Sequence, residues 1–447
     1  MDSLVAKQLY LALQRIRGEP VSFALADVLR TDFLSVEELH QIRSDRQLAQ
    51  LRFAIDHVPY YKVTYAPFSR RIRSARTWVE VNELMQDLPI LGKDTVRKNP
   101  QAFHAEVAGL RTHLDRTSGS SGTPLVFRVD QTAWAYRHAL MYRTMVTFGV
   151  EIGEPYGAFF GLHWNKRRRL HVMIRDHFLN RVRVSAYEIE PRNCDKHLRA
   201  IRKQHPTHLW GYPSAIYDFC LMLRDRGLDL HDLKLKAVFL TGEPLRSYQR
   251  ELIGQVTGSR CVDTYGSAEG GYHAAECPDG SLHLCSEATW LQVRPTSSGE
   301  RGDAIVTDMM LRAVPLIRYA IGDEVVLRPG PCSCGRAHEM LLSVEGRSGA
   351  AIVLPNGRTI SPHLPRSIFW HLAGEGVVRQ YRFVHRNSPA LELYLVVGHA
   401  FRDEHLKLIE QESRKAFGSD VALSIRVVDK LDVLPNAKHQ DFVFLSG

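Results

Sequence analysis

The sequence predicts an α/β fold with a large first domain and a small α+β domain after it. From about residue 115 onward, short apolar runs typical of strands alternate with longer amphipathic runs typical of helices. From about residue 348 the order changes to two strands, one helix and a further strand. A chain of 447 residues exceeds one compact unit, so we expect domains at residues 1–346 and 347–447.

The elements follow from the pattern in chain order. Apolar residues from Leu4 to Ile16 and the amphipathic stretch 36–57 predict an N-terminal helical region. Strands are expected at residues 157–162, 182–187, 237–240 and 304–307, and helices at residues 194–204, 214–226 and 247–256. In the last part, strands are expected at residues 378–384, 391–397 and 423–428, and a helix at residues 403–417. Glycine-rich turns at the ends of such strands are where nucleotide sites form.

Composition is typical of a soluble enzyme, with 44% hydrophobic and 24% charged residues. The sequence has no run of 18 apolar residues, and Lys7, Gln14 and Arg15 interrupt the first apolar stretch. We therefore expect neither a membrane span nor a secretory signal, and a cytoplasmic protein. The 7 cysteines are an odd number, and a reducing compartment argues against a disulfide framework.

The formal charge of +9 raises the possibility of nucleic-acid binding. The densest basic run is Lys166 to Arg169, with Trp164 and Phe178 nearby as aromatic side chains on which bases could stack. However, the charge is spread over 58 basic and 49 acidic residues, and the sequence contains no recognisable nucleic-acid-binding module. We favour the interpretation that this positive charge attracts anionic ATP or a phosphorylated acceptor. The alternative is that the basic residues form an ordinary solvated surface.

A run of hydroxyl residues and glycines is the first candidate nucleotide site. It consists of Thr117, Ser118, Gly119, Ser120, Ser121, Gly122 and Thr123. Glycines let the backbone approach an anion, and Ser and Thr supply donors around it, so the run predicts a phosphate-binding loop. A lysine is missing after its last glycine, which excludes the P-loop of ATPases. A plain flexible loop is the alternative.

Four further segments give this loop a context. In chain order they are Tyr265-Gly266-Ser267-Ala268-Glu269, Arg318-Tyr319-Ala320-Ile321-Gly322-Asp323, Gly346-Arg347-Ser348 and a late lysine, Lys438. The set resembles the adenylate-forming (acyl-activating) ligase superfamily. Residues 58–61, 88–91, 211–214, 241–245 and 332–336 are similar to the phenylacetate–CoA ligase branch, and within it to proteins of capsular polysaccharide biosynthesis.

The resemblance implies that the chain joins a carboxylic acid to the α-phosphate of ATP and releases pyrophosphate. Such a site mainly neutralises charge. The 117–123 loop would hold the β- and γ-phosphates, Glu269 would hold Mg²⁺, and Asp323 would accept both ribose hydroxyls. The adenine ring would lie between the loop of Gly242, Glu243 and Pro244 and the Tyr265-Gly266-Ser267 motif. For Glu269, the alternative is a surface glutamate after a turn.

Arg347 and Lys438 lie at and beyond the hinge that the resemblance implies, and Lys438 is the expected adenylation residue on a mobile small domain. Two positions depart from the family pattern, because Ala437 stands where a glycine precedes the lysine and Gly349-Ala350 replace an acidic hinge position. These departures leave the acceptor open between coenzyme A and an amine or other nucleophile. A catalytically silent ATP-binding protein is a further alternative. The oligomeric state, monomer or homodimer, is also open.

The acid pocket implied by the resemblance combines two segments. It involves Trp210, Gly211 and Tyr212, together with Gly270, Gly271 and His273. Glycines beside aromatic side chains leave room for a small or aromatic acid, although the same residue types line ordinary cores.

Cysteine spacing predicts a separate structural zinc site. Cys277 and His283 are followed by Cys332-x-Cys334, which supplies soft ligands in two clusters. Some phenylacetate–CoA ligases carry a matching site. Cys285 is the alternative to His283 as the fourth ligand, and buried free thiols are the alternative to a metal.

Overall fold

The structure is a computed structural model that describes most of the chain. The described residues are 1–116, 126–161, 169–295, 301–347, 352–355, 359–360, 368–369, 377–386, 390–418, 420–432 and 441–444. In these residues no helix is both long and apolar enough to cross a membrane.

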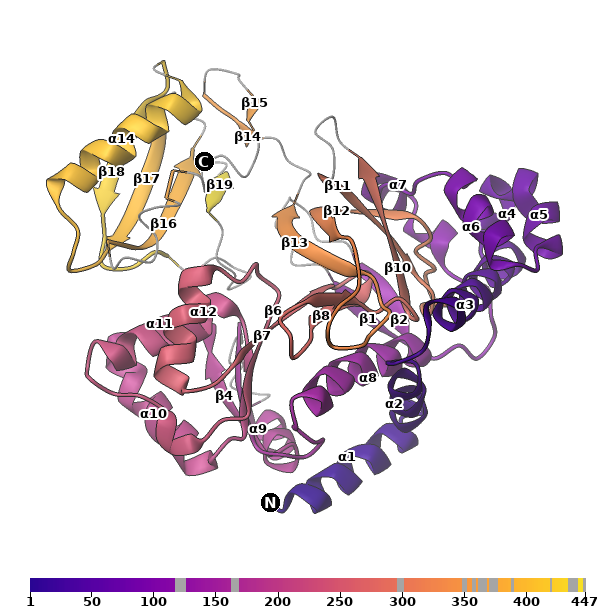
Figure 1. Cartoon of the computed structure of the whole chain (residues 1–447), viewed down its shortest axis with the longest axis horizontal. Coiled ribbons are helices and arrows are strands. Elements are labelled where there is room, and N and C mark those ends of the chain that lie inside the picture. The colour runs from indigo at the N-terminus through magenta and orange to yellow at the C-terminus, as the bar shows by residue number, and fades with distance from the viewer. Residues whose placement is uncertain are drawn as a thin grey trace.

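The N-terminal part is helical, as predicted, and is drawn in indigo and purple in Figure 1. Its helices are α1 (Ser3–Ile16), α2 (Val21–Arg30), α3 (Val36–His57), α4 (Pro59–Thr64), α5 (Ser69–Ser74), α6 (Trp78–Asp87) and α7 (Lys93–Lys98). Helix α3 begins at a capping box, in which Ser35 and Glu38 each accept a hydrogen bond from the other's backbone N–H. The same device starts α6, with Thr77 and Glu80.

The centre of the molecule is a mixed sheet of 11 strands in the order β10-β11-β12-β13-β9-β8-β7-β6-β5-β3-β4. The parallel strands are β3 (Tyr156–Phe160), β4 (Arg181–Ser185), β5 (His208–Gly211), β6 (Ala237–Thr241) and β7 (Cys261–Ser267). The antiparallel part consists of β8 (Gly271–Glu276), β9 (Leu282–Leu284), β10 (Thr289–Pro295), β11 (Arg301–Asp308), β12 (Tyr319–Arg328) and β13 (Met340–Arg347). Strands β1 (Thr112–Arg116) and β2 (Val126–Asp130) form a separate antiparallel pair.

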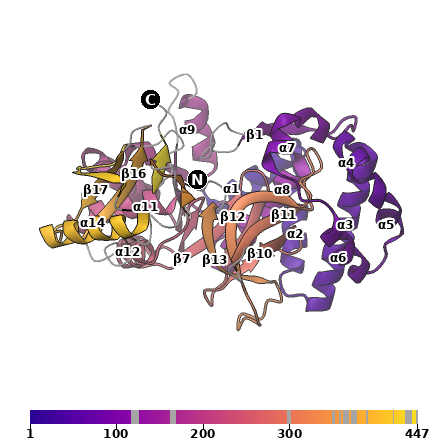
Figure 2. The same ribbon diagram turned by 90° about the horizontal axis from the view of Figure 1, so that it is seen from above.

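Helices cover the parallel strands and bury two apolar cores. These helices are α8 (Gln131–Thr147), α9 (Arg169–Phe178), α10 (Cys194–Gln204), α11 (Pro213–Arg224) and α12 (Ser247–Thr257). Helices α10 to α12 pack over one face, where Val184 of β4 and Leu209 of β5 are buried. Helix α8 packs against α2 and β8 and belongs to the larger core. Helix α9 projects from the side of the molecule opposite to α12 (Figure 2).

The C-terminal part has a sheet of its own, in the order β18-β17-β16-β19. It contains β16 (Val378–His385), β17 (Ala390–Val397), α14 (Asp403–Phe417), β18 (Ala422–Val427) and β19 (Phe442–Phe444), and is preceded by a pair of short strands, β14 (Ile352–Val353) and β15 (Thr359–Ile360). This unit lies beside α11 and α12 (Figure 1). Gln380 donates to both oxygens of Asp218 on α11, at 2.7 and 2.8 Å, and Arg379 pairs with Asp225 at 2.9 Å.

The α/β fold with a smaller C-terminal domain is confirmed, and the predicted helices 36–57, 194–204 and 403–417 have the bounds of α3, α10 and α14. The strand expected at 182–187 is too long. Strand β4 ends at Ser185, and Ala186–Glu188 form a 3₁₀ turn, because the chain leaves the sheet there to enter α10. The strand expected at 157–162 ends at Phe160.

Candidate functional site

The candidate site lies at the carboxyl ends of the parallel strands, the edge at which α/β sheets bind ligands. Gly242 follows β6 with a φ of +80°, a left-handed conformation that favours glycine. The next residue, Glu243, accepts a hydrogen bond from the backbone N–H of Ser214 at 3.1 Å, in the first turn of α11. The segment expected to bind adenine therefore contacts the segment expected to line the acid pocket.

Tyr265 and Asp323 meet at this edge. The Tyr265 hydroxyl donates to Oδ2 of Asp323 at 2.8 Å, although β7 and β12 are not neighbours in the sheet. Arg347, the last residue of β13, is the backbone partner of Asp323 across the β12–β13 ladder. The structure thus brings together the two residues expected to contact adenine and ribose, with the hinge residue in the adjacent strand.

Glu269 lies in the turn between β7 and β8 and is buried, with 3% of its surface exposed. It is therefore not a surface glutamate. Lys93 Nζ, at the start of α7, is 2.9 Å from Glu269 Oε1. Arg137 of α8 donates to the carbonyl oxygens of Ala268 and Glu269, at 3.0 and 2.8 Å, and so fixes the turn. Sequence reasoning missed Lys93 and Arg137, because nothing in their local pattern marks them as neighbours of a residue far along the chain.

His273 is fully buried, and its Nε2 lies 3.0 Å from the Ser267 hydroxyl. Burial, reinforced by the charge of Arg137, lowers the pKa of His273 to about 3, so the imidazole is neutral at physiological pH. The neighbouring glycines are required by close packing. A Cβ on Gly270 would lie 2.6 Å from the His273 ring, and one on Gly271, where φ is +79°, would lie 2.8 Å from Arg137. Protein side chains therefore occupy the space beside these glycines.

Trp210 and Tyr212 lie at the end of β5, away from His273 on β8. Both pack against Phe160 of β3, with ring centroids 5.0 and 5.1 Å apart. Three strand spacings, about 14 Å, separate β5 from β8. A Cβ on Gly211 would lie 2.3 Å from the carbonyl oxygen of Phe159, so this glycine lets β5 approach β3. The six residues expected to form one acid pocket thus fall into two groups.

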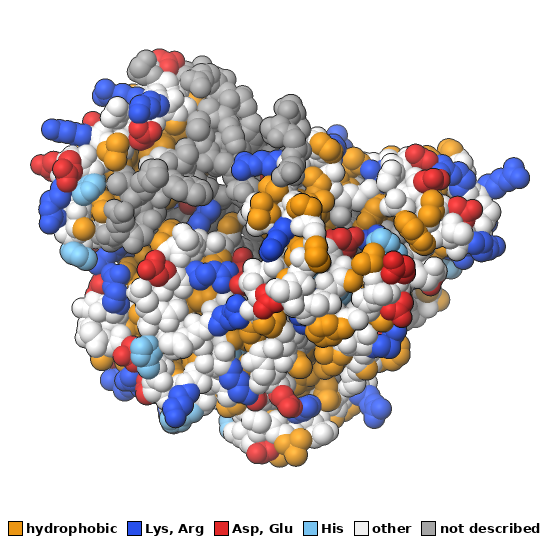
Figure 3. Space-filling view, viewed as in Figure 1, with side chains coloured by type: hydrophobic (Ala, Val, Ile, Leu, Met, Phe, Trp, Pro, Cys, Tyr) orange, Lys and Arg blue, Asp and Glu red, His pale blue; other side chains and the backbone are white. Residues whose placement is uncertain are grey.

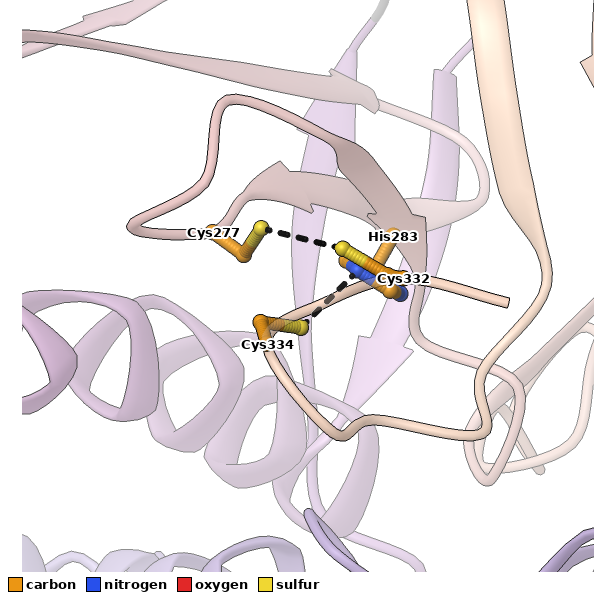
Figure 4. Close-up of side chains that lie close together, drawn as sticks. All are labelled: Cys277, His283, Cys332 and Cys334. Atoms are coloured by element: carbon orange, nitrogen blue, oxygen red, sulfur yellow. Dashed lines mark hydrogen bonds between the residues drawn. The ribbon is translucent and has the colours of Figure 1, made fainter.

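Cys277, His283, Cys332 and Cys334 form a cluster whose ligand atoms all lie within 4.8 Å of one another (Figure 4). Cys277 follows β8, His283 lies on β9, and the two other cysteines lie between β12 and β13. The Cys277 and Cys332 sulfurs are 3.8 Å apart, and Cys334 Sγ lies 3.3 Å from His283 Nε2. His283 Nδ1 lies 3.0 Å from the His338 carbonyl oxygen, an arrangement that leaves Nε2 for a metal.

The donor set of three sulfurs and one imidazole nitrogen fits a tetrahedral zinc ion. Burial raises the pKa of the Cys277 thiol to about 11. For Cys332, burial acts in the same direction, but hydrogen bonds from Ser281 and neighbouring groups prevail and lower its pKa to about 6. Cys285, the alternative ligand, lies elsewhere, with its sulfur 3.5 Å from an Arg143 nitrogen. The structure therefore groups His283, and not Cys285, with the three cysteines.

Some expected site residues lie outside the described part of the chain. These are the 117–123 loop and Lys438, together with Lys166 to Arg168 of the basic run. For Arg347 the structure describes only the backbone. On the face shown in Figure 3, acidic and basic side chains are interspersed, so the net positive charge is not gathered into one field there.

No protein-family model matches the chain. Protein CapK of Staphylococcus aureus is 23% identical over 367 residues, which cover 79% of this chain and 79% of CapK. A phenylacetate-coenzyme A ligase of Pseudomonas putida is 25% identical over 358 residues, covering 74% of this chain and 75% of the ligase.

Solved structures have the same fold. A 2-hydroxyisobutyryl-CoA ligase, in the postadenylation state with a bound acyl-adenylate, superposes with a TM-score of 0.70 at 16% identity and covers 93% of this chain and 91% of that one. Sequence relatives and fold agree with the order of motifs along the chain. The relatives in sequence and the solved structures together support the adenylate-forming ligase superfamily.

Proposed function

We propose that this protein is an AMP-forming ligase, which activates a carboxylic acid with ATP as an acyl-adenylate and transfers the acyl group to coenzyme A. The observation that carries the proposal is the meeting of Tyr265 and Asp323, at 2.8 Å, beside the Gly242–Glu243 turn. An acceptor-only carboxylate with two oxygens suits the two hydroxyls of a ribose, and the tyrosine ring supplies a flat surface for a base. The phenylacetate–CoA ligase and the acyl-CoA ligase fold described above support the same reaction class.

The charges around Glu269 suit a polyphosphate. Lys93 lies against the Glu269 carboxylate, and Arg137 holds the backbone of the same turn. Arg137 also lies 3.5 Å from the buried Asp308 carboxylate, so the turn combines two cations with two carboxylates, a set that can share a metal ion and phosphate oxygens between them. Glu269 would hold Mg²⁺, a hard cation that prefers oxygen ligands and supplies charge neutralisation for the phosphates. The 117–123 loop would hold the β- and γ-phosphates beside it.

Lys438 on the small domain and Arg347 at the proposed domain boundary, residues 346/347, complete the proposal. Lys438 would bridge the attacking carboxylate and the departing phosphate oxygens, which lowers the cost of bringing two anions together. Arg347, opposite Asp323 in the sheet, would contribute near the hinge.

For the acid, we propose a small or aromatic carboxylate that binds beside Trp210 and Tyr212. These rings lie at the carboxyl ends of the parallel strands with Phe160, whereas His273 is fully buried and held by Ser267. An amine or another nucleophile is the second candidate acceptor, favoured by Ala437 and by Gly349-Ala350 at positions where the family pattern differs. The cysteine–histidine cluster would hold a structural zinc ion that ties the 332–336 loop to β8 and β9.

One experiment tests the reaction class. Purified protein is incubated with ATP, Mg²⁺ and a panel of acids, with and without coenzyme A, and the nucleotide products are separated. AMP and pyrophosphate in equal amounts are expected, with loss of free thiol when coenzyme A is the acceptor. ADP and phosphate as the products would overturn the proposal, and ATP binding without AMP would identify a non-catalytic protein. If an acid of the panel gives AMP but no loss of free thiol in the presence of coenzyme A, the result would favour an amine or another nucleophile as the acceptor.

A further inference from the structure

Two arginines of β4 meet an aspartate of α9 on the face of β4 that points away from α10, and a third arginine, Arg175, lies next to that aspartate in α9. Arg181 and Arg183 alternate along β4 with Val182 and Val184, which pack into the core under α10. Both arginines therefore point to the other face, where α9 carries Arg175 and Asp176.

Asp176 orients two of the arginines. It accepts from Nε and Nη2 of Arg181, at 2.9 and 2.5 Å, and from Nε of Arg183 at 2.6 Å. Arg181 also donates to the Tyr156 hydroxyl at 3.3 Å. The side chain of Arg183 is only 9% exposed and that of Asp176 only 12%. This is a built and largely dry arrangement, unlike a solvated surface pair.

Among the residues that the structure describes, these contacts leave some arginine N–H donors unpaired and some positive charge without a counterion. The Nη2 atom of Arg183 is buried and has no hydrogen-bond partner within the described structure. Such a buried donor without a partner normally costs free energy, so a missing ligand is a direct explanation. In the described part of the chain, the Arg175 guanidinium has no ion pair either. Partial desolvation, followed by the nearby charges of Arg183 and Arg181, lowers the pKa of Arg175, which indicates that these cations are crowded.

We propose that Arg175 and Arg183 form a binding site for a phosphate group, separate from the ATP site. Three arginines and one aspartate leave two positive charges, which match a phosphate monoester of about −1.5 to −2 at neutral pH better than a carboxylate. The guanidinium fork is the side chain best suited to bind phosphate oxygens in pairs. The ligand is either free phosphate or the phosphate of a larger molecule. The site does not depend on the proposed reaction, because it is built from other residues on the α9 side of the sheet.

The test uses the full chain with the nucleotide site filled by saturating ATP, without an acid. Binding of inorganic phosphate and of adenosine 3′,5′-bisphosphate is measured by calorimetry, against chloride at equal ionic strength. The variants are Arg175→Ala, Arg183→Met and Arg199→Ala, the last being an exposed arginine on α10 over the opposite face.

We expect wild type and Arg199→Ala to bind at least one probe, and Arg175→Ala and Arg183→Met to bind it about tenfold more weakly or worse, as for loss of one hydrogen bond to a charged group. Tighter binding of the bisphosphate would identify the ligand as the phosphate of a larger molecule. Tighter binding of inorganic phosphate would identify it as the free ion. If Arg183→Met does not fold, the exposed Arg175→Ala decides alone. Absence of binding to wild type, or equal affinity in Arg175→Ala and Arg199→Ala, overturns the proposal.

Discussion

The hydrogen bond between Tyr265 and Asp323 makes the sharpest prediction about nucleotide binding. Tyr265→Phe removes the hydroxyl that donates to Asp323 Oδ2 at 2.8 Å and keeps the aromatic ring. A hydrogen bond to an ionised group contributes about 1.5 to 3 kcal/mol, and about 1.4 kcal/mol corresponds to tenfold in affinity. If this bond holds Asp323 in position for the ribose, the Kd for ATP should rise about tenfold to a hundredfold.

The assay is equilibrium binding of ATP with Mg²⁺, which needs no knowledge of the acid. Tyr272→Phe is a matched control, because Tyr272 lies on the adjacent strand β8 and its hydroxyl bonds to Thr144 Oγ1 at 3.0 Å, on the α8 side. The control should bind ATP as wild type does. A Kd for Tyr265→Phe within twofold of wild type, or an equal loss in Tyr272→Phe, would refute the assignment of Tyr265 and Asp323 to the nucleotide.

Three more predictions follow from other parts of the molecule. Lys438→Ala should slow pyrophosphate release about 10² to 10³-fold and leave ATP binding and consumption of a preformed acyl-adenylate nearly intact. The control Lys415→Ala, at an exposed lysine on α14, should change none of these rates or affinities. Adenylation by Lys438→Ala at the wild-type rate would contradict the catalytic role of Lys438. Protein purified without chelator should contain about one equivalent of zinc by metal analysis. Cys334→Ser should lose both the metal and thermal stability, whereas Cys285→Ser should keep the metal. Wild-type protein without zinc would exclude the site. Burial and the charge of Glu276 raise the pKa of Asp263 to about 7, above its usual value near 4. This carboxyl therefore stabilises the fold when protonated, and its contribution is lost as pH rises from about 4 to about 7. In urea unfolding, Asp263→Asn should gain stability relative to wild type between pH 5 and pH 8, and a difference independent of pH would show that Asp263 is not protonated in the fold.

The sequence alone predicted those helices, strands and motifs that are determined by residues close together in the chain. The bounds of α3 were predicted from the apolar spacing of residues 36–57, and the structure adds a capping box at Ser35; both signals are local. The order of the glycine, tyrosine and aspartate motifs pointed to the superfamily that the relatives support, because each motif is a short segment with its own signature. The grouping of Cys277, His283, Cys332 and Cys334 was also predicted from cysteine spacing, and the zinc ion itself stays a prediction.

Only the tertiary structure decided contacts between segments far apart in the chain. Lys93 reaches Glu269, and Arg137 fixes the same turn, because α7 and α8 pack against the sheet at the point where β7 ends. The choice of His283 on β9 over Cys285, one residue after β9, depends on which side chain faces the 332–334 loop. The separation of Trp210 from His273 depends on strand order. Residue spacing sets which side chains share a face, but the packing of elements sets which faces meet, and that packing is a property of the whole chain.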